Sequence, residues 1–138
     1  MIMDPRWRRL VRDPARIALA ALGDVPAQVV LADDRTLRLL NLRHQPHGPV
    51  GANRTTNVLT FDATREIVLA SGTVAREART AGRSTAHHLA HLVMHGALHL
   101  EGHLHDRPGE ARRMEMEEAR RLARIRVPNP WKPRSVRA

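Results

Sequence analysis

The segment from Thr85 to Leu100 constrains the fold more than any other part of this sequence. Its apolar residues, Leu89 and Leu92 among them, recur at the spacing of one helix face, which predicts a single long helix with a buried side. Ser84 precedes the segment and is a preferred N-cap residue. Gly102 follows the segment and is expected to end the helix.

Shorter patterned runs predict the remaining elements. Four further helices are expected near residues 14–22, 36–42, 72–81 and 110–125, and three strands near residues 27–32, 57–61 and 66–70. Two aspartates, Asp33 and Asp34, are candidate N-caps for the second of these helices. Residues 44–53 hold two prolines, two glycines and no periodic pattern, which predicts a loop.

The order of these elements predicts the fold class. Together with the length of 138 residues, it indicates one α+β domain spanning residues 1–138. We expect a small mixed β-sheet with helices packed on it and a core at about residues 14–126. The tail at residues 127–138 contains three prolines and a tryptophan, which predicts irregular structure.

The chain is strongly basic. Its formal net charge is +9, and Lys132 is the only lysine among 23 basic residues. Because the arginine guanidinium is planar and always charged, a polyanion is the natural partner, although an arginine bias also follows from genomic nucleotide composition. Two tryptophans, one phenylalanine and no tyrosine argue against an aromatic RNA-binding platform. Phosphate contacts are therefore expected to dominate any binding to nucleic acid.

Composition also excludes several classes of protein. There is no cysteine, which excludes a disulfide framework, a thiolate zinc site and a cysteine nucleophile. Any metal must therefore be held by nitrogen and oxygen. No apolar stretch approaches the roughly 18–20 residues of a membrane span, and the run from Ile17 to Leu22 is too short for a signal peptide. We expect a soluble, cytoplasmic protein with no membrane partner.

Three histidines near the end of the long predicted helix form a candidate metal site. His95 and His99 are four residues apart, so their rings share one helix face and can reach the same ion. Gly102 can adopt the left-handed conformation that turns the chain back and brings His105 towards them. Three imidazoles leave one coordination position open, as a catalytic zinc site requires. They also suit nickel, copper or iron.

The spacing of these histidines also matches the metzincin protease signature, His-Glu-x-x-His-x-x-Gly-x-x-His. The general-base glutamate of that signature would be residue 96, which is Gly96. Glu101 lies about 200° around the helix from His99 and is a poor replacement, so a metallopeptidase would need a carboxylate from elsewhere in the chain. Glycine inside a helix costs about 1 kcal/mol relative to alanine, which indicates a packing or substrate-access role for Gly96.

The remaining histidines are not expected to bind the ion. Histidines at every fourth position from His87 to His103 form a ladder, but such a ladder drifts about 40° around the helix at each step. Packed or solvent-facing roles are expected for His44, His47, His87, His88, His91 and His103.

Two blocks of this sequence resemble the YbeY family. Residues 95–105 are similar to the family signature His-Gly-x-Leu-His-Leu-x-Gly-Tyr-Asp-His, with the histidines and glycines in register. Residues 56–61 resemble the family's Thr-Asn/Asp-Val-Leu-Ser-Phe strand, and Leu40-Asn41 matches the Leu-Asn that precedes this strand. The similarity runs from about residue 27 to residue 126.

The resemblance implies a fold and an activity. The implied fold is a single α+β domain with a zincin-like metal-binding helix, which carries a Zn²⁺ ion on His95, His99 and His105. The implied activity is that of a single-strand-specific endoribonuclease in 3′-end maturation of small-subunit (16S) ribosomal RNA and in ribosome quality control. Single-stranded RNA, the small ribosomal subunit and its assembly factors are the implied partners, and no DNA is expected. Either water or the RNA 2′-hydroxyl is the nucleophile.

The sequence departs from the family pattern in three places. The Gly-Asp expected before Ile67 is Arg65-Glu66. The Tyr-Asp of the signature is His103-Leu104, and the loop that follows Asn41 is longer than usual. The family's functional arginine in this loop therefore corresponds to either Arg43 or Arg54. That arginine would hold the RNA phosphate through two parallel hydrogen bonds.

One alternative belongs to another class of protein. A non-catalytic RNA-binding ribosome assembly factor would use its metal only to hold the fold. RNA cleavage that depends on the three histidines would separate the two functions.

Asp106, next to the third histidine, either orients a ligand or caps the following turn.

Overall fold

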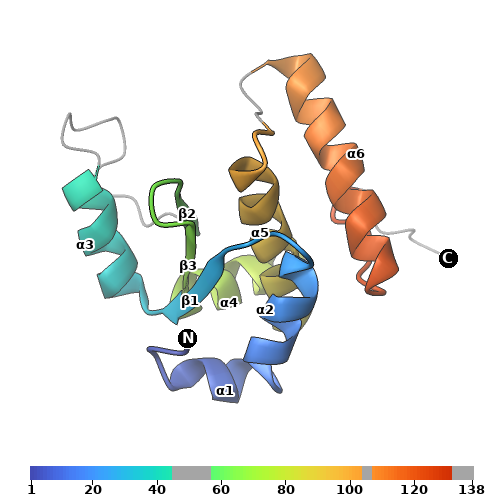
Figure 1. Cartoon of the computed structure of the whole chain (residues 1–138). Helices are drawn as coiled ribbons and strands as arrows, with labels where there is room; N and C mark the ends of the chain where they lie inside the picture. Colours follow the sequence, from blue (N-terminus) through green and yellow to red (C-terminus); the bar gives the residue numbers. More distant parts are fainter. Residues whose placement is uncertain (45–56, 104–106, 132–138) are drawn as a thin grey trace, which may run out of the picture.

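The computed structural model describes residues 1–44, 57–103 and 107–131. Within these residues the chain forms helices packed around a small sheet, as Figure 1 shows. No helix in the described ranges is long and apolar enough to cross a membrane. The elements in chain order are α1 (Arg6–Leu10), α2 (Pro14–Leu22), β1 (Gln28–Ala32), α3 (Asp34–His44), β2 (Val58–Phe61), β3 (Glu66–Ala70), α4 (Ser71–Thr80), α5 (Thr85–Leu100) and α6 (Pro108–Arg124).

The sheet has three strands in the order β1-β3-β2. β3 lies in the centre, pairs in parallel with β1 and pairs antiparallel with β2. In these registers Val68 of β3 lies opposite Val30 of β1 and opposite Leu59 of β2. The predicted α+β fold with a small mixed sheet is therefore confirmed.

Helices cover both faces of this sheet, because successive side chains of a strand point to opposite sides. On one face Leu31 and Ile67 join the larger core, to which α2 and α5 contribute. On the other face Val30 and Val68 pack with Leu37 of α3. Figure 1 shows α3 on one side of the sheet and α2 with α5 on the other.

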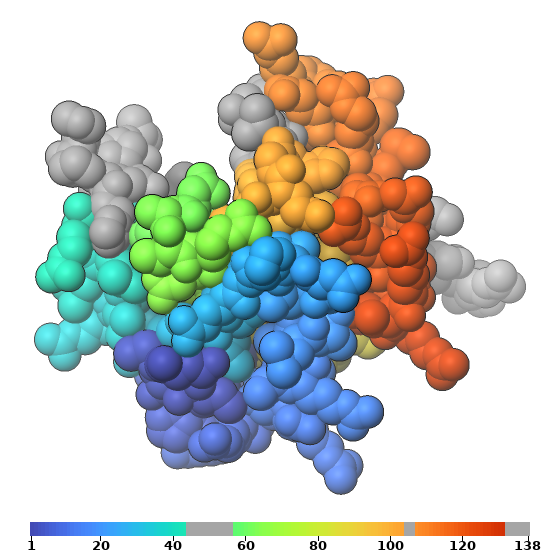
Figure 2. All heavy atoms as spheres, in the orientation of Figure 1, coloured from blue at the N-terminus to red at the C-terminus, as the bar shows by residue number. Residues whose placement is uncertain are grey.

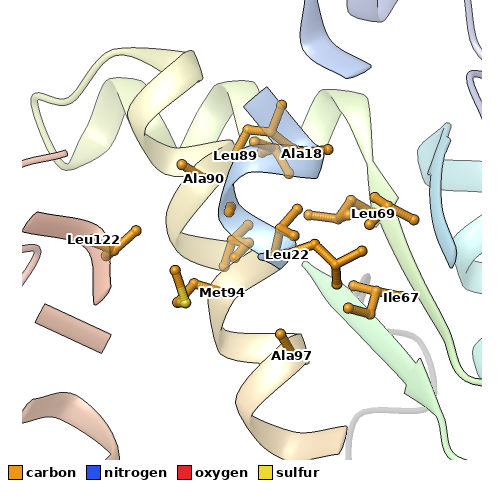
Figure 3. Packing of buried hydrophobic residues seen from close by; sticks show 14 of the residues in the cluster. Ala18, Leu22, Ile67, Leu69, Leu89, Ala90, Met94, Ala97 and Leu122 are labelled. Atoms are coloured by element: carbon orange, nitrogen blue, oxygen red, sulfur yellow. The ribbon is translucent and has the colours of Figure 1, made fainter. Parts of the chain in front are cut away.

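α5 is the central helix of the larger core. Figure 3 shows Met94 and Ala97 of α5 among side chains from α2, β3 and α6. At Gly96 the helix meets the sheet, since an added Cβ would lie 2.9 Å from Ile67 Cγ2 and 3.1 Å from Thr60 Cγ2. Of the two roles expected for Gly96, packing or substrate access, these contacts support packing.

The predicted start of the core at residue 14 is wrong. Trp7 on α1 is fully buried, and its Nε1–H donates to the carbonyl of Ala32 at 2.9 Å. Ile2 forms a parallel bridge with Leu31, so the N-terminal residues extend the edge of β1. α1 has five residues, three of them arginines, which is too short for a helical pattern to be recognised. The tertiary contact of Trp7 and the backbone hydrogen bonds to β1 hold this segment in place.

The predicted limits of the helix at residues 36–42 are also too narrow. α3 starts at Asp34 and continues to His44, because polar residues such as Arg43 propagate a helix about as well as apolar ones. Asp33 caps its first turn, with the Thr36 N–H donating to Oδ1 at 2.8 Å. Residue 44 of the predicted loop therefore belongs to α3, and residues 45–53 lie outside the described ranges.

Candidate metal centre

Both ends of α5 are closed by the residues that the sequence indicates. The Ser84 hydroxyl accepts the N–H of His87 at 3.0 Å. At the other end Gly102 has a φ of 97°, and its N–H donates to the carbonyl of His99 at 3.0 Å. The N–H of His103 donates to the carbonyl of Leu98 at 3.0 Å, which completes a glycine-based C-cap. The predictions that Ser84 is the N-cap of α5 and that Gly102 ends the helix are confirmed.

His95 and His99 face each other near this closed end. Their ring centroids are 4.6 Å apart, and their Nε2 atoms are 3.0 Å apart. Two imidazole ligands of a tetrahedral zinc ion, each about 2.0–2.1 Å from it, are separated by about 3.3 Å. The two rings therefore fit one shared ion with only a small outward movement. Figure 2 shows the end of α5 at the surface, between the β2–β3 hairpin and α6.

A buried carboxylate from α6 lies behind His95. Oε1 of Glu118 is 2.6 Å from Nδ1 of His95, and Oε2 is 2.9 Å from Nε2 of His91. The indole Nε1–H of Trp131 also donates to Oε2 at 2.9 Å. The Glu118 side chain is only 1% exposed, so three N–H groups replace the water that it has lost.

These contacts decide the charge of Glu118. Burial raises the pKa of its carboxyl, but the hydrogen bonds from His91 and His95 outweigh burial and lower the pKa to about 2. The carboxylate is therefore ionised at neutral pH and can only accept hydrogen bonds. Nδ1 of His95 must carry the proton, which leaves the lone pair on Nε2, the nitrogen that faces His99.

His91, His95 and Glu118 could themselves hold a metal ion. One ligand atom from each of the three residues lies within 4.8 Å of the other two. The carboxylate distances of 2.6 Å and 2.9 Å are those of charge-assisted hydrogen bonds. Two positions for an ion therefore follow from the geometry. One lies among these three groups, and the other lies at the facing Nε2 atoms of His95 and His99.

A pocket of about 300 Å³ opens beside His95. Met114, Glu115 and Trp131 line it together with Glu118. Trp131 is 48% exposed, and its ring packs edge-on against His91 at a centroid distance of 5.5 Å. The pocket provides access from the surface to the imidazole of His95.

The structure brings together two of the three predicted ligands, His95 and His99. Arg43 lies exposed on the last turn of α3. The other predicted site residues lie outside the described ranges, and these are Arg54, His105 and Asp106. Their positions therefore stay predictions.

Glu101 is committed to another contact. Its Oε1 lies 2.6 Å from Nη1 of Arg121 on α6, and Arg121 also contacts Glu117. The expectation that Glu101 is a poor general base agrees with this ion pair.

Sequence reasoning missed Glu118 and the polar role of His91. His91 is buried, as a packed histidine would be, but it donates to Glu118 and does not simply fill space. A signal for Glu118 exists in the sequence. Met114, Glu118 and Leu122 follow one another at four-residue spacing and are all buried on α6. A glutamate in an apolar helix stripe indicates a buried polar partner.

Comparison with known proteins identifies the family. The family model described as "Endoribonuclease YbeY" matches residues 3–126. The chain belongs to the YbeY endoribonuclease family. The resemblance inferred from the two sequence blocks is thereby confirmed.

Individual YbeY relatives match over most of their length. Endoribonuclease YbeY from Gluconobacter oxydans is 41% identical over 149 aligned positions, which cover 96% of this chain and 86% of the relative. Endoribonuclease YbeY from Aromatoleum aromaticum is 42% identical over 123 positions, covering 84% and 77%. The solution structure of TM1509 from Thermotoga maritima matches with a TM-score of 0.54 over 99% of this chain and 97% of that chain, at 21% identity. This structural likeness shows a shared fold.

Proposed function

We propose that this chain is a metal-dependent endoribonuclease that cleaves single-stranded RNA, with one Zn²⁺ ion held by His95, His99 and His105. One observation carries the proposal. The Nε2 atoms of His95 and His99 lie 3.0 Å apart, while the buried carboxylate of Glu118 occupies Nδ1 of His95. A metal-binding histidine typically donates its second ring N–H to a carboxylate in this way, which fixes its tautomer.

In this proposal the metal ligands, Glu118 and the arginines have separate roles. Zinc bound to the three histidines would supply Lewis acidity, which polarises a phosphoryl oxygen and promotes attack by water or the RNA 2′-hydroxyl. Glu118 keeps the proton of His95 on Nδ1 and prevents the ring from turning. Arg43 or Arg54 would hold the phosphate by a two-pronged contact. The pocket beside His95 supports access of a substrate to this group.

The proposed biological setting follows from the family. We place the activity in 3′-end maturation of small-subunit ribosomal RNA and in ribosome quality control, in the cytoplasm. The small ribosomal subunit and its assembly factors would be the partners, and DNA would not be a substrate. The net charge of +9 supports binding to a phosphate backbone. Residues 1–138 would act as one domain.

A cleavage assay with matched variants tests the proposal. Wild-type protein, His99→Ala and His87→Ala are purified, their metal content is measured by elemental analysis, and each is incubated with an end-labelled single-stranded RNA. His87 lies on the first turn of α5, three turns from His99, and is the control. We expect His99→Ala to lose most metal and most cleavage and His87→Ala to keep both. Equal cleavage by wild type and His99→Ala would overturn the proposal.

The same assay addresses the alternatives. A wild-type protein that binds zinc and RNA but cleaves nothing would be a non-catalytic assembly factor. A peptidase is not proposed, because residue 96 lacks the general base and packs directly on Ile67 and Thr60. A longer side chain at this place would collide with the sheet.

A further inference from the structure

Arg83, in the turn between α4 and α5, contacts two histidines of α5. Its Nη1 lies 3.3 Å from Nδ1 of His88 and 3.3 Å from Nδ1 of His91. The guanidinium has five N–H donors, no acceptor, and stays protonated in proteins. Both Nδ1 atoms must therefore accept, and each of these neutral rings carries its proton on Nε2.

This assignment makes both rings donors at their far side. Nε2 of His88 lies 3.0 Å from Oε1 of Glu77, which also accepts from Asn57 at 3.2 Å. These contacts anchor one side of the guanidinium. Nε2 of His91 lies 2.9 Å from Oε2 of Glu118 and donates to it. A continuous chain of hydrogen bonds thus runs from Arg83 to the carboxylate behind His95.

The chain ends at the proposed metal ligand. Glu118 receives the Nε2–H of His91 and the Nε1–H of Trp131 on Oε2, so its other oxygen remains for Nδ1–H of His95 at 2.6 Å. Three donors from two segments hold this buried carboxylate in one orientation. The orientation of Glu118 in turn fixes the ring plane of His95.

We propose that Arg83 is a positioning residue for the metal centre, acting through His91 and Glu118 to hold His95 in the tautomer that presents Nε2. The proposal rests on the metal site of the proposed function. It also selects between the two positions for the ion. A metal on Nε2 of His91 would require the ring proton on Nδ1, where the guanidinium already donates. Arg83 therefore keeps the ion away from His91 and directs it to Nε2 of His95.

Nitrogen NMR of the histidine rings tests the first step directly. Long-range ¹H–¹⁵N spectra of the metal-free wild-type protein report which ring nitrogen carries each proton. We expect His91 protonated on Nε2 and His95 on Nδ1. In Arg83→Met, which removes the donors and keeps a long side chain, Nδ1 of His91 loses its hydrogen bond and its ¹⁵N signal should shift, while the contact of Nε2 with Glu118 keeps the proton on Nε2. A wild-type His91 protonated on Nδ1 would overturn the proposal, whatever the variants do.

Zinc titration tests the second step. Metal-free Arg83→Met should bind Zn²⁺ about tenfold to a hundredfold more weakly than wild type, as is usual when a partner behind a ligand is lost. Arg83→Lys retains a cationic donor and should recover part of the affinity. Arg79→Met, an exposed position on the last turn of α4, is the matched control and should change neither affinity nor tautomer. Wild-type zinc affinity in Arg83→Met contradicts the proposal.

The two proposals fail in different ways. If zinc shifts the wild-type ¹⁵N signals of His91 and leaves Nε2 of His95 unchanged, the ion lies among His91, His95 and Glu118, and both proposals about the site are wrong. If zinc binds at Nε2 of His95 but RNA is not cleaved, the enzymatic function fails while the positioning role of Arg83 stands. Neither the tautomer nor the zinc affinity depends on an RNA substrate.

Discussion

The Nδ1 nitrogen of His95 lies 2.6 Å from Oε1 of Glu118, across the interface between α5 and α6. The two residues are 23 positions apart in the chain, and their contact is part of the packing of the two helices. A carboxylate from one helix therefore decides which nitrogen of a histidine on the other helix is available to a metal.

Glu118→Gln should weaken zinc binding by about tenfold to a hundredfold. The neutral amide has one acceptor oxygen and a donating NH₂ group, so it cannot accept hydrogen bonds from His91, His95 and Trp131 together. Titration of the metal-free variant with Zn²⁺ measures the effect. Glu110→Gln, on the first turn of the same helix, is the control and should bind as wild type does. Unchanged affinity in Glu118→Gln would mean that the carboxylate does not support the metal ligand.

Gly96→Ala should destabilise the protein by about 1–3 kcal/mol, although alanine is the better helix former. The new methyl group would lie 2.9 Å from Ile67 Cγ2, which is buried in the core and cannot move freely. Urea unfolding monitored by circular dichroism gives the free energy of unfolding. Gly109→Ala is a matched helical control, because among the described residues its Cβ would meet only Arg113 Nη1, at 3.9 Å. An equal gain in stability in both variants would contradict the close contact between α5 and the sheet at Gly96.

Asp34→Asn should lower stability at neutral pH by about 1.5 kcal/mol. Burial raises the pKa of the Asp34 carboxyl, but hydrogen bonds from Arg76 at 2.8 Å and from the Thr73 N–H at 2.9 Å outweigh burial and lower it. A lowered pKa in the folded state means that the unfolded state binds more protons, so stability rises with pH in this window. The contribution is complete above the unfolded value of about 3.9 and is lost as pH falls through the folded value.

Unfolding curves of wild type and Asp34→Asn at several pH values check this sign. The difference in the free energy of unfolding should be constant from pH 7 to about pH 5 and should shrink below about pH 4. Asp24→Asn, at an exposed aspartate, is the control. A difference that grows on acidification would show that the ionised carboxylate does not stabilise the contact between α3 and α4.

RNA binding should weaken steeply with salt, because phosphate contacts release counterions. In the His99→Ala background, which should bind without cleaving, the dissociation constant for a short single-stranded RNA is measured over a range of salt concentrations. Arg43→Gln should reduce the slope of log K against log salt by about 0.7, the value for one contact with a single strand. Arg35→Gln, on the first turn of α3, is the control. An equal reduction in both variants would assign no specific phosphate contact to Arg43.

The helix that carries the site could be predicted from the sequence, because its determinants are local. A residue four positions away on a helix lies on the same face, so His95 and His99 meet whatever surrounds them. Ser84 and Gly102 close the ends through contacts within a few residues. The order of the strands and helices and the metal-binding motif are patterns of the same short range.

The tertiary structure decided the properties that depend on distant partners. The sequence did not predict α1, whose Trp7 donates a hydrogen bond to the carbonyl of Ala32, 25 residues along the chain. The need for glycine at residue 96 is explained by Ile67 of β3, which packs directly against it. The roles of Glu118 and His91 depend on the packing of α6 on α5, which brings the buried carboxylate to the rings of His91 and His95.

The arrangement of His95 and His99 therefore has two determinants. Their four-residue spacing, and with it the capacity to share one ion, follows from the sequence because helix geometry converts spacing directly into proximity. Which nitrogen of His95 faces His99 is set by Glu118, which accepts from Nδ1 of His95 and is itself held by a chain of hydrogen bonds from Arg83 through His91. Tautomers depend on the partners in space, and only the packed structure supplies those partners.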